Sequence, residues 1–344
     1  MKQLIKKVAY HAGVLPALHR FRNRGTLTVA MFHRIVPASD DRHRGADPEW
    51  TMTPDTFERC LRFFKRHYHI VSAEQVFAAM RGERMLPGPS LLVTFDDGWA
   101  DTAEFAQPLL ARHGVPALVF VAGCAIDSAA PFWQEHVYSM LAARDGAMAQ
   151  LDALLGQHGV SAALPDHADE GAIRDAIALL ERQAPSLRTL IIGALDTAPV
   201  GAPPAMMSQA QLRALRDAGV AIGGHGMEHI PLTKADDLAA ELGQAQRCLA
   251  HHLGQPVIES MSFPHGAQSP GVIAACKAAG YRYLFSSVPL LVDPRSSQAR
   301  TGPLGRIHIS ERALLDAGGR FQPALLATWL FLRPVAAAEG ASGG

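Results

Sequence analysis

Residues 91–101, with the sequence LLVTFDDGWAD, combine an apolar segment with two adjacent carboxylates. The run Leu91–Phe95 predicts a buried strand of a parallel sheet. It ends at Asp96 and Asp97. Carboxylates at the end of a buried strand destabilise the folded state unless they are paired or bind a cation. In α/β folds, chemistry lies at the carboxyl ends of strands, so the two form a candidate functional pair, one a base and one a metal ligand. The alternative is a turn that caps a helix, because the sequence Asp-Asp-Gly is also typical of turns.

A second candidate site follows another short strand. The segment Val220–Gly224 is mostly apolar and leads directly into His225 and His229, which are four residues apart. If this loop opens as a helical turn, both imidazoles share one face, and with a carboxylate they form the open three-ligand layout of catalytic zinc. The alternative is two solvated loop histidines, because the chain has 16 histidines and chance pairs are common. The position after a strand, downstream of Asp-Asp-Gly, favours the metal site.

Three motifs resemble, in the same order, those of the polysaccharide deacetylases, the NodB-homology carbohydrate esterases. They are Thr94–Gly98, His225–His229 and Ser262–Gly266, and each follows a segment typical of a strand. The resemblance covers about residues 26–310. It implies an α/β fold, namely a distorted (β/α)7–8 barrel of the polysaccharide deacetylase type with a helical insertion. It also implies a hydrolase that removes N-acetyl groups from a sugar in a polysaccharide, an oligosaccharide or a lipid-linked glycan precursor.

The resemblance also implies roles for individual residues. In the family the first Asp of the pair is the general base and the second binds metal. On the matching positions, Asp96 is therefore the expected base. The expected ligands of one divalent ion, with zinc ahead of cobalt and nickel, are Asp97, His225 and His229.

The chain departs from the family's pattern at two points. Many members place an arginine before the proline of the third motif, where it steadies the base, but here Phe263 precedes Pro264. Arg306 in the last predicted strand is a candidate substitute. The family's general acid is often a histidine near the end of the domain, and His308 and His265 are the two candidates. Strand alternation predicts that Arg306 and His308 share a face.

Aromatic and histidine side chains near the motifs are candidates for contacting the sugar. The pair Phe132-Trp133 predicts a sugar-stacking wall, although aromatic residues are more often part of a core. The backbone N–H of Gly98 or of Trp99 is a candidate donor to the developing oxyanion. The expected substrate-binding residues are Trp99, Phe263, Pro264, Trp133 and His33.

The domain organisation is predicted from changes in composition along the chain. Residues 1–25 form a basic N-terminal helical segment, 26–334 the deacetylase barrel and 335–344 a flexible tail. A helix-rich stretch at about 130–205 breaks the β-α-β rhythm, ends in the proline-rich loop 199–204, and is interpreted as an insertion. It either caps the cleft, as loops on barrels often do, or is a structural flank without contact to the substrate.

Capping residues predict where several helices begin. The first and last barrel strands are expected at Leu27–Phe32 and Leu304–Ile309. The predicted capping pairs are Thr53 with Pro54, Ser72 with Gln75, Ser208 with Gln211, and Thr233 with Asp236.

The N-terminal segment has no acidic residue before Asp40. It either packs on the domain or rests as a basic amphipathic helix on an anionic membrane surface. The apolar helix at 322–332, which contains Trp329, is too short to span a bilayer, but Trp is favoured at membrane interfaces. The positions that predict one apolar helical face, interrupted near Pro16, are Leu4, Val8, Leu15 and Leu18.

Composition limits the classes of function. The 344 residues are 48% hydrophobic and 19% charged, which is typical of a globular protein, and the net charge of zero provides no argument for a nucleic-acid partner. The four cysteines have no CxxC spacing, and no secretion signal is recognisable, so we expect a cytoplasmic protein that can dwell at the inner face of the membrane. Its oligomeric state is not predicted. Two other functions stay open, a deformylase or other non-peptide C–N amide hydrolase, and a pseudoenzyme that binds glycans without metal.

Overall fold

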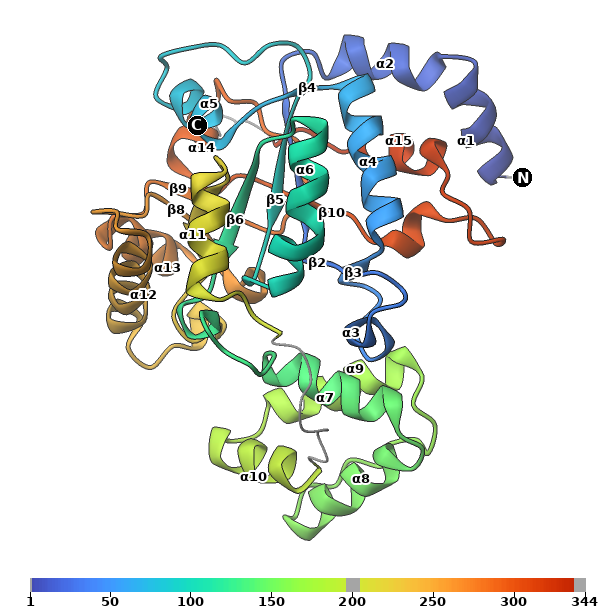
Figure 1. The fold of residues 1–344 in the computed structure, drawn as a ribbon, viewed down its shortest axis with the longest axis vertical. Coiled ribbons are helices and arrows are strands. Elements are labelled where there is room, and N and C mark those ends of the chain that lie inside the picture. The colour runs from blue at the N-terminus through green and yellow to red at the C-terminus, as the bar shows by residue number, and fades with distance from the viewer. Residues whose placement is uncertain (1, 196–204, 337–344) are drawn as a thin grey trace, which may run out of the picture.

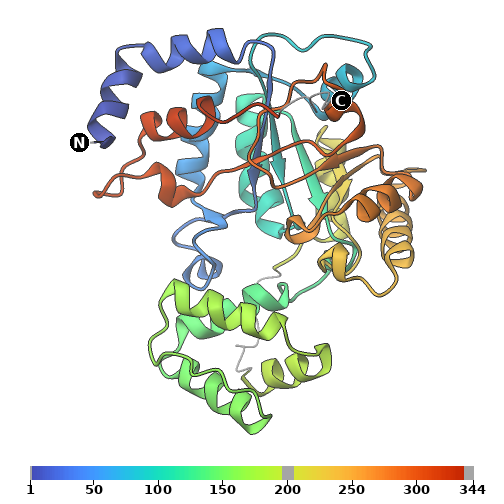
Figure 2. The same cartoon turned by 180° about the vertical axis from the view of Figure 1, so that it is seen from behind.

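A curled, parallel sheet forms the centre of the computed structural model, which describes residues 2–195 and 205–336 (Figures 1 and 2). Its strands follow the order β10-β1-β5-β6-β7-β8-β9, with β4 also paired to β5, and every pair is parallel. The two ends of the sheet approach each other where Phe285 in β9 bridges to Leu304, just before β10. The predicted distorted barrel is thus confirmed, as a half-barrel surrounded by helices. The strands are β1 Leu27–Phe32, β4 His69–Ile70, β5 Ser90–Phe95, β6 Ala117–Val121, β7 Ala221–Gly224, β8 Ser260–Ser262, β9 Tyr283–Phe285 and β10 Ile307–His308.

Helices connect the strands and cover the outside of the sheet (Figure 1). A small second sheet pairs β2 Arg34–Ile35 with β3 Thr51–Met52. The helices are α1 Lys2–His11, α2 Val14–Arg22, α3 Asp41–Arg44, α4 Pro54–His67, α5 Ala73–Met80, α6 Gln107–His113, α7 Trp133–Ala143, α8 Ala147–Gln157, α9 Glu170–Glu181, α10 Pro185–Leu195, α11 Gln209–Asp217, α12 Leu238–Leu253, α13 Pro270–Ala278, α14 Ser297–Thr301 and α15 Pro323–Phe331.

Strand β5 is buried along its whole length because both of its faces are covered. Leu91, Val93 and Phe95 pack into the large core that includes the surrounding helices. Leu92 points the other way, into a second cluster with Phe120 of β6. This two-sided burial explains the continuous apolar run, since a parallel strand covered on both faces needs no polar alternation.

Most predicted caps are present. The side chain of Thr53 accepts the backbone N–H of Thr56, and complete capping boxes open α5 and α11 at Ser72 and Ser208. The cap predicted at Thr233 is wrong, because residues 232–234 form a short 3₁₀ turn. Helix α12 therefore begins later, where Asp237 accepts the backbone N–H of Ala240.

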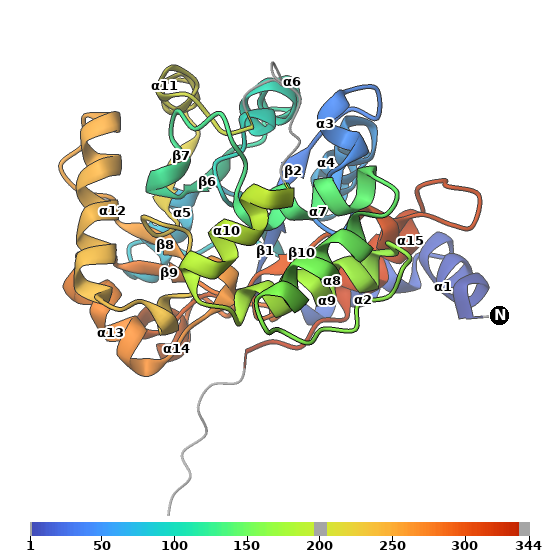
Figure 3. The same cartoon turned by 90° about the horizontal axis from the view of Figure 1, so that it is seen from below.

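Helices α7–α10 form a separate helical layer between β6 and α11 in the chain. They share their own apolar cluster, and they lie beyond the carboxyl ends of the strands (Figures 1 and 3). Two ion pairs tie this layer to β2 and to the segment before β3, namely Arg34 with Glu135 and Asp47 with Arg174, each at 2.5 Å. The predicted proline-rich loop at 199–204 falls outside the described residues.

The N-terminal segment forms two helices instead of one interrupted apolar face. Gly13, with φ of 80°, separates α1 from α2 and rotates their faces relative to each other. Leu15 is buried against the domain, whereas Leu4, Val8 and Leu18 are exposed. Both helices contact α15.

At the other end of the chain, the predicted flexible tail begins too early. Val335 bridges to Leu291, and the backbone N–H of Ala336 donates to the carbonyl of Leu291. The rest of the predicted tail, 337–344, lies outside the described residues. Within the described residues, none of the helices combines the length and the apolar character needed to cross a bilayer.

Candidate active site

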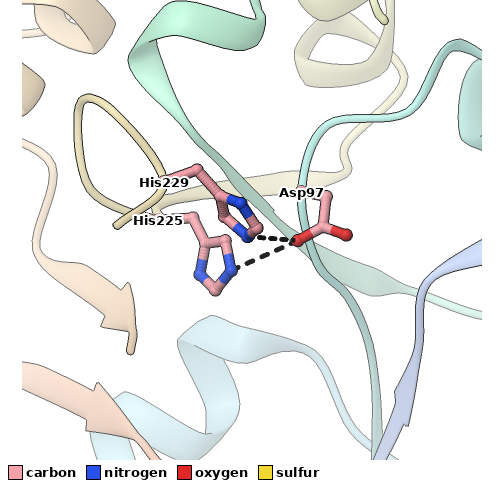
Figure 4. A group of neighbouring side chains, drawn as sticks. All are labelled: Asp97, His225 and His229. Atoms are coloured by element: carbon pink, nitrogen blue, oxygen red, sulfur yellow. Dashed lines mark ion pairs between the residues drawn. The ribbon is translucent and has the colours of Figure 1, made fainter. Parts of the chain in front are cut away.

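Asp97, His225 and His229 meet at the carboxyl ends of β5 and β7 (Figure 4). The Oδ1 atom of Asp97 lies 3.2 Å from Nε2 of His225 and 3.3 Å from Nε2 of His229. Asp97 and His225 are buried, and His229 is only partly exposed. The sequence motifs, 128 residues apart in the chain from Asp97 to His225, are thus brought to one point.

Asp97 is held in a fixed orientation. Its backbone has φ of 79°, which turns the chain sharply at the end of β5 and lets the neighbouring Asp96 and Asp97 face the same site. The indole Nε1 of Trp99 donates to Oδ2 of Asp97 at 2.8 Å, so Oδ1 is left to face the imidazoles. Burial alone would raise the pKa of Asp97, but hydrogen bonds from His225 and His229 outweigh it and hold the pKa well below its usual value.

His225 is oriented by a backbone carbonyl. Its Nδ1 lies 2.9 Å from the carbonyl oxygen of Ser262 in β8, and because a carbonyl only accepts, Nδ1 carries the proton. Nε2 faces Asp97 and is then the nitrogen that would bind a metal ion once it has lost the proton that it shares with the carboxylate. A carbonyl or carboxylate partner on the outer nitrogen is the usual arrangement for a metal-ligating histidine.

The loop that carries both histidines is a bend, and the expected helical turn is wrong. The carboxylate of Glu241 in α12 accepts the backbone N–H groups of Met227 and Glu228, at 2.7 and 3.0 Å, which replaces helical hydrogen bonding. His229 has φ of 52°, in the left-handed region, and its ring stacks on Phe132 with centroids 3.9 Å apart. Local sequence does not reveal Glu241, because it lies 12 residues beyond His229.

Asp96 is paired with the arginine that the third motif lacks. Nη1 of Arg306 lies 2.6 Å from Oδ1 of Asp96, and Nη2 lies 2.7 Å from Oδ2. Ser262 also donates its hydroxyl to Asp96 at 3.1 Å. Burial raises the pKa of Asp96, but the charges of Arg306 and His225 lower it more, so the carboxylate stays ionised at neutral pH.

A cavity of about 540 Å³ opens above these residues and contains both carboxylates and both histidines in its wall. The helical layer supplies part of the wall through Phe132, Glu135, Tyr138 and Arg174. Helices α7 and α9 therefore reach the cavity, which is the arrangement expected of an insertion that caps the cleft.

The expected substrate-binding residues separate into two groups. His33, Trp99 and Phe263 line the cavity. Pro264 does not; it packs against the histidine loop, where a side chain on Gly226 would meet its Cγ at 3.2 Å. Trp133 is also placed wrongly by the sequence, because its ring packs in the helical layer, with the guanidinium of Arg188 4.6 Å from the ring centroid.

The two candidate acids differ in position. His265 lines the cavity, and its Nε2 lies 3.1 Å from the carbonyl oxygen of His229. His308 contacts three residues of the cavity wall: its ring lies 5.6 Å from that of His33 and 4.5 Å from that of Trp50, and its Nδ1 lies 3.5 Å from Oε1 of Glu49. Burial lowers the pKa of His265 to about 4 and that of His308 to about 3, so both imidazoles are neutral at neutral pH.

Two backbone and side-chain features were not found by sequence reasoning. The N–H of Gly98 donates to the carbonyl of Asp96 at 3.0 Å, so it is not free for an oxyanion, and Trp99 is left as the candidate. Trp50, which is 40% exposed, lines the cavity and lies against His33, with ring centroids 4.5 Å apart. No motif marks Trp50, because it lies in an irregular segment before β3.

The donor set fits a divalent metal ion. Asp97, His225 and His229 each offer one ligand atom, and these atoms lie within 4.8 Å of one another. Ligand atoms that share an ion tetrahedrally at about 2.0–2.2 Å lie about 3.4 Å apart, close to the spacings of 3.2 and 3.3 Å seen here. One carboxylate and two neutral imidazoles suit zinc, with a position open to water or substrate.

The polysaccharide deacetylase family model matches residues 83–284, more than half of the chain. The chain therefore belongs to the polysaccharide deacetylase family. None of the curated proteins matches it.

Solved structures share the fold. IcaB from Ammonifex degensii is 16% identical with a TM-score of 0.54, covering 89% of this chain and 97% of that one. The Streptococcus pyogenes deacetylase PplD, in complex with acetate, is 16% identical with a TM-score of 0.55, covering 89% and 99%. A de-N-acetylase from Aggregatibacter actinomycetemcomitans is 16% identical with a TM-score of 0.51, covering 82% and 94%.

Proposed function

We propose that this protein is a metal-dependent N-deacetylase that hydrolyses an N-acetyl group on a sugar of a polysaccharide, an oligosaccharide or a lipid-linked glycan precursor. The observation that carries the proposal is the pairing of two differently held carboxylates in one cavity. Asp97 faces two imidazoles, whereas Asp96, its neighbour in the chain, is clamped by Arg306. The three related structures described above, two of them named deacetylase or de-N-acetylase, support the same reading.

The two carboxylates suit different tasks. Asp97, His225 and His229 would hold the divalent ion, which when bound supplies a Lewis acid and lowers the pKa of water. Asp96 stays ionised beside them and is placed to accept a proton from the attacking water. Arg306 keeps Asp96 charged and fixes its orientation through two parallel hydrogen bonds.

The leaving amine needs a proton, and two residues are candidates to supply it. His265 lies at the cavity wall beside His229, and His308 lies against His33, Trp50 and Glu49 of the same wall. Both rings are neutral at neutral pH, so either would have to take up a proton during the reaction before it donates one to the amine. His265 is favoured because it lines the cavity itself.

The cavity also indicates what kind of substrate it accepts. Trp50 presents aromatic surface beside His33, and Phe132 does so beside His229; sugars pack their C–H faces on such rings. Glu135, Tyr138 and Arg174 of the helical layer add polar groups that can bond to hydroxyls. Helices α7 and α9 therefore contribute to substrate choice in this proposal.

Acetate release tests the proposal directly. Purified protein is stripped of metal, reloaded separately with zinc, cobalt or nickel, and incubated with N-acetylated oligosaccharides and lipid-linked sugars. We expect metal-dependent acetate release by the wild type, and loss of both bound metal and release in His229→Ala, with the circular dichroism spectrum unchanged. A surface variant, His167→Ala, provides the matched control, since His167 lies on the exposed loop before α9.

Three outcomes would point elsewhere. Formate release from N-formyl sugars without acetate release would replace the proposed acetyl substrate with a formyl one. Glycan binding by a protein that binds none of the three metals would indicate a pseudoenzyme. Metal binding without hydrolysis of any N-acylated sugar would contradict the reaction class itself.

A further inference from the structure

The two N-terminal helices expose an unusual amount of apolar surface. Helix α2 places Val14, Leu18 and Phe21 at a spacing that forms one stripe along the helix, and Phe21 is 81% exposed. Helix α1 exposes a second set, Leu4, Ile5 and Val8. Large exposed apolar patches on a folded protein mark surfaces that a membrane or another protein covers.

The exposed stripe of α2 is not a by-product of poor packing. The opposite side of the same helix is well packed, because Leu15 and His19 are buried and His19 stacks on Phe331 of α15 at 3.9 Å. Arg22 also donates to the backbone carbonyls of Phe331 and Arg333. The helix is therefore anchored by one face and presents apolar side chains on another.

A basic groove borders this stripe. It has a volume of about 820 Å³, lies between the N-terminal helices and α4, and has no acidic residue among those that line it. Ala17 of α2 lines the groove and sits next to Leu18 of the stripe. The titratable residues of the groove wall, other than Tyr10, are His11, Arg20, Arg59, Arg62, Arg66 and His67.

The arginines of the groove are largely uncommitted. Arg59, Arg62 and Arg66 follow one face of α4 and are exposed. Among the residues that the structure describes, only Arg62 of these three forms an ion pair, with Glu58 at 2.7 Å. The chain has no acidic residue before Asp40, so nothing in α1 or α2 neutralises the groove. This surface therefore offers apolar side chains and unpaired positive charge side by side, which matches the acyl and phosphate layers of an anionic lipid surface.

We propose that α1, α2 and α4 form a docking surface for anionic phospholipid membranes. In this arrangement the apolar stripes of α1 and α2 enter the interface, and Arg20, Arg59 and Arg66 bind lipid phosphates. The surface lies at the opposite end of the molecule from the helical layer that walls the cavity (Figure 1). Docking therefore leaves the cavity open, and the inference does not depend on the reaction proposed above.

Trp329, the other candidate for the membrane interface, makes contacts within the domain instead. Its Nε1 donates to the carbonyl of His308 at 2.9 Å, and the guanidinium of Arg333 lies 3.7 Å from its ring centroid. The docking surface is therefore assigned to the N-terminal helices and α4, without Trp329.

Vesicle flotation of the intact protein tests the proposal at low ionic strength. Vesicles of equal parts phosphatidylcholine and phosphatidylglycerol are expected to carry the protein upward, and vesicles of phosphatidylcholine alone are not. Phe21→Ser with Leu18→Ser should weaken binding about tenfold or more, because two apolar side chains no longer leave water. Arg59→Gln with Arg66→Gln should weaken it about fivefold per residue and reduce its salt dependence.

A matched pair of changes at the far end of the molecule serves as the control. Leu190 and Arg182 lie in and next to the helical layer and are exposed, so Leu190→Ser with Arg182→Gln removes one apolar and one basic side chain there without affecting flotation. Circular dichroism melting of all variants confirms that they are folded.

Other occupants would give distinct results. If the wild type stays at the bottom of the gradient with anionic vesicles, the proposal is wrong. Binding of inorganic phosphate without vesicle binding would assign the groove to a free phosphate. A concentration-dependent dimer that Phe21→Ser dissociates, again without vesicle binding, would assign the apolar stripe to a second copy of the chain.

Discussion

The guanidinium of Arg306 donates hydrogen bonds to both oxygens of Asp96, with Nη1–Oδ1 at 2.6 Å and Nη2–Oδ2 at 2.7 Å. The two residues are 210 positions apart in the sequence. Nε of the same guanidinium donates to the carbonyl of Ser286, and Nη2 also donates to Ser262. The carboxylate next to the metal ligand is thereby kept ionised and fixed, which distinguishes it from Asp97. The first two predictions follow from this pair.

Asp96→Asn should keep the metal and lose most of kcat. The amide cannot accept the proton of the attacking water, and a general base is typically worth roughly 10²–10⁴ in rate. Metal-to-protein ratios from elemental analysis, measured beside kcat for acetate release, check the result. Loss of the metal would mean that the roles of Asp96 and Asp97 are reversed.

Arg306→Met should raise the pKa of Asp96, because burial then acts without the main opposing charge. Activity that needs the ionised carboxylate is lost as pH falls through this pKa, so the acidic limb of kcat/KM should move to higher pH. The unpaired buried charge should also cost about 3–5 kcal/mol of stability. Arg306→Lys retains the charge and should restore part of the wild-type pH profile. Identical pH profiles for the wild type, Arg306→Met and Arg306→Lys would contradict the proposed role of Arg306 in keeping Asp96 ionised.

Trp99→Phe should weaken metal binding by about 10–100-fold, the usual effect of removing a partner of a metal ligand. The change removes the N–H that donates to Oδ2 of Asp97 at 2.8 Å, together with part of the buried indole ring. Zinc affinity by competition with a chelator is the measurement. Trp133→Phe is the matched control, since Trp133 lies in the helical layer, and equal effects of the two changes would argue against the proposed role of Trp99.

The two candidate acids can be separated by substitution. His265→Ala should lower kcat by at least about 10², because His265 itself lines the cavity. His308→Asn should cost clearly less. Single-turnover rates with an N-acetylated oligosaccharide decide between them, and the reverse order of effects would make His308 the acid.

His19 should make stability depend on pH below neutrality. Burial lowers its pKa from 6.5 to about 4, so the folded state prefers the neutral ring, and the unfolded state takes up a proton first as pH falls. The stabilisation is present above about pH 6.5 and should fall by roughly 2 kcal/mol between pH 7 and pH 5. Urea unfolding of the wild type and of His19→Phe, which can still stack on Phe331, measures the difference. A variant with the wild-type pH dependence would show that another group is responsible.

Local sequence was sufficient for much of the fold. Strand β1 lies at the predicted residues, and the caps at Thr53, Ser72 and Ser208 are present, because these features depend on neighbours within a few positions. The motifs at Asp97 and His225 were also recognisable, since each directly follows an apolar strand and parallel strands deliver their carboxyl ends to one edge.

The tertiary structure alone decided how those residues are supported. Arg306 replaces the missing arginine, Glu241 shapes the histidine loop, and Phe132, not its neighbour Trp133, faces the cavity. Each of these depends on contacts between segments far apart in the chain, for which the local pattern carries no signal. The same holds for the N-terminal helices, because their packing against the distant helix α15 determines which apolar side chains are buried and which are left at the surface.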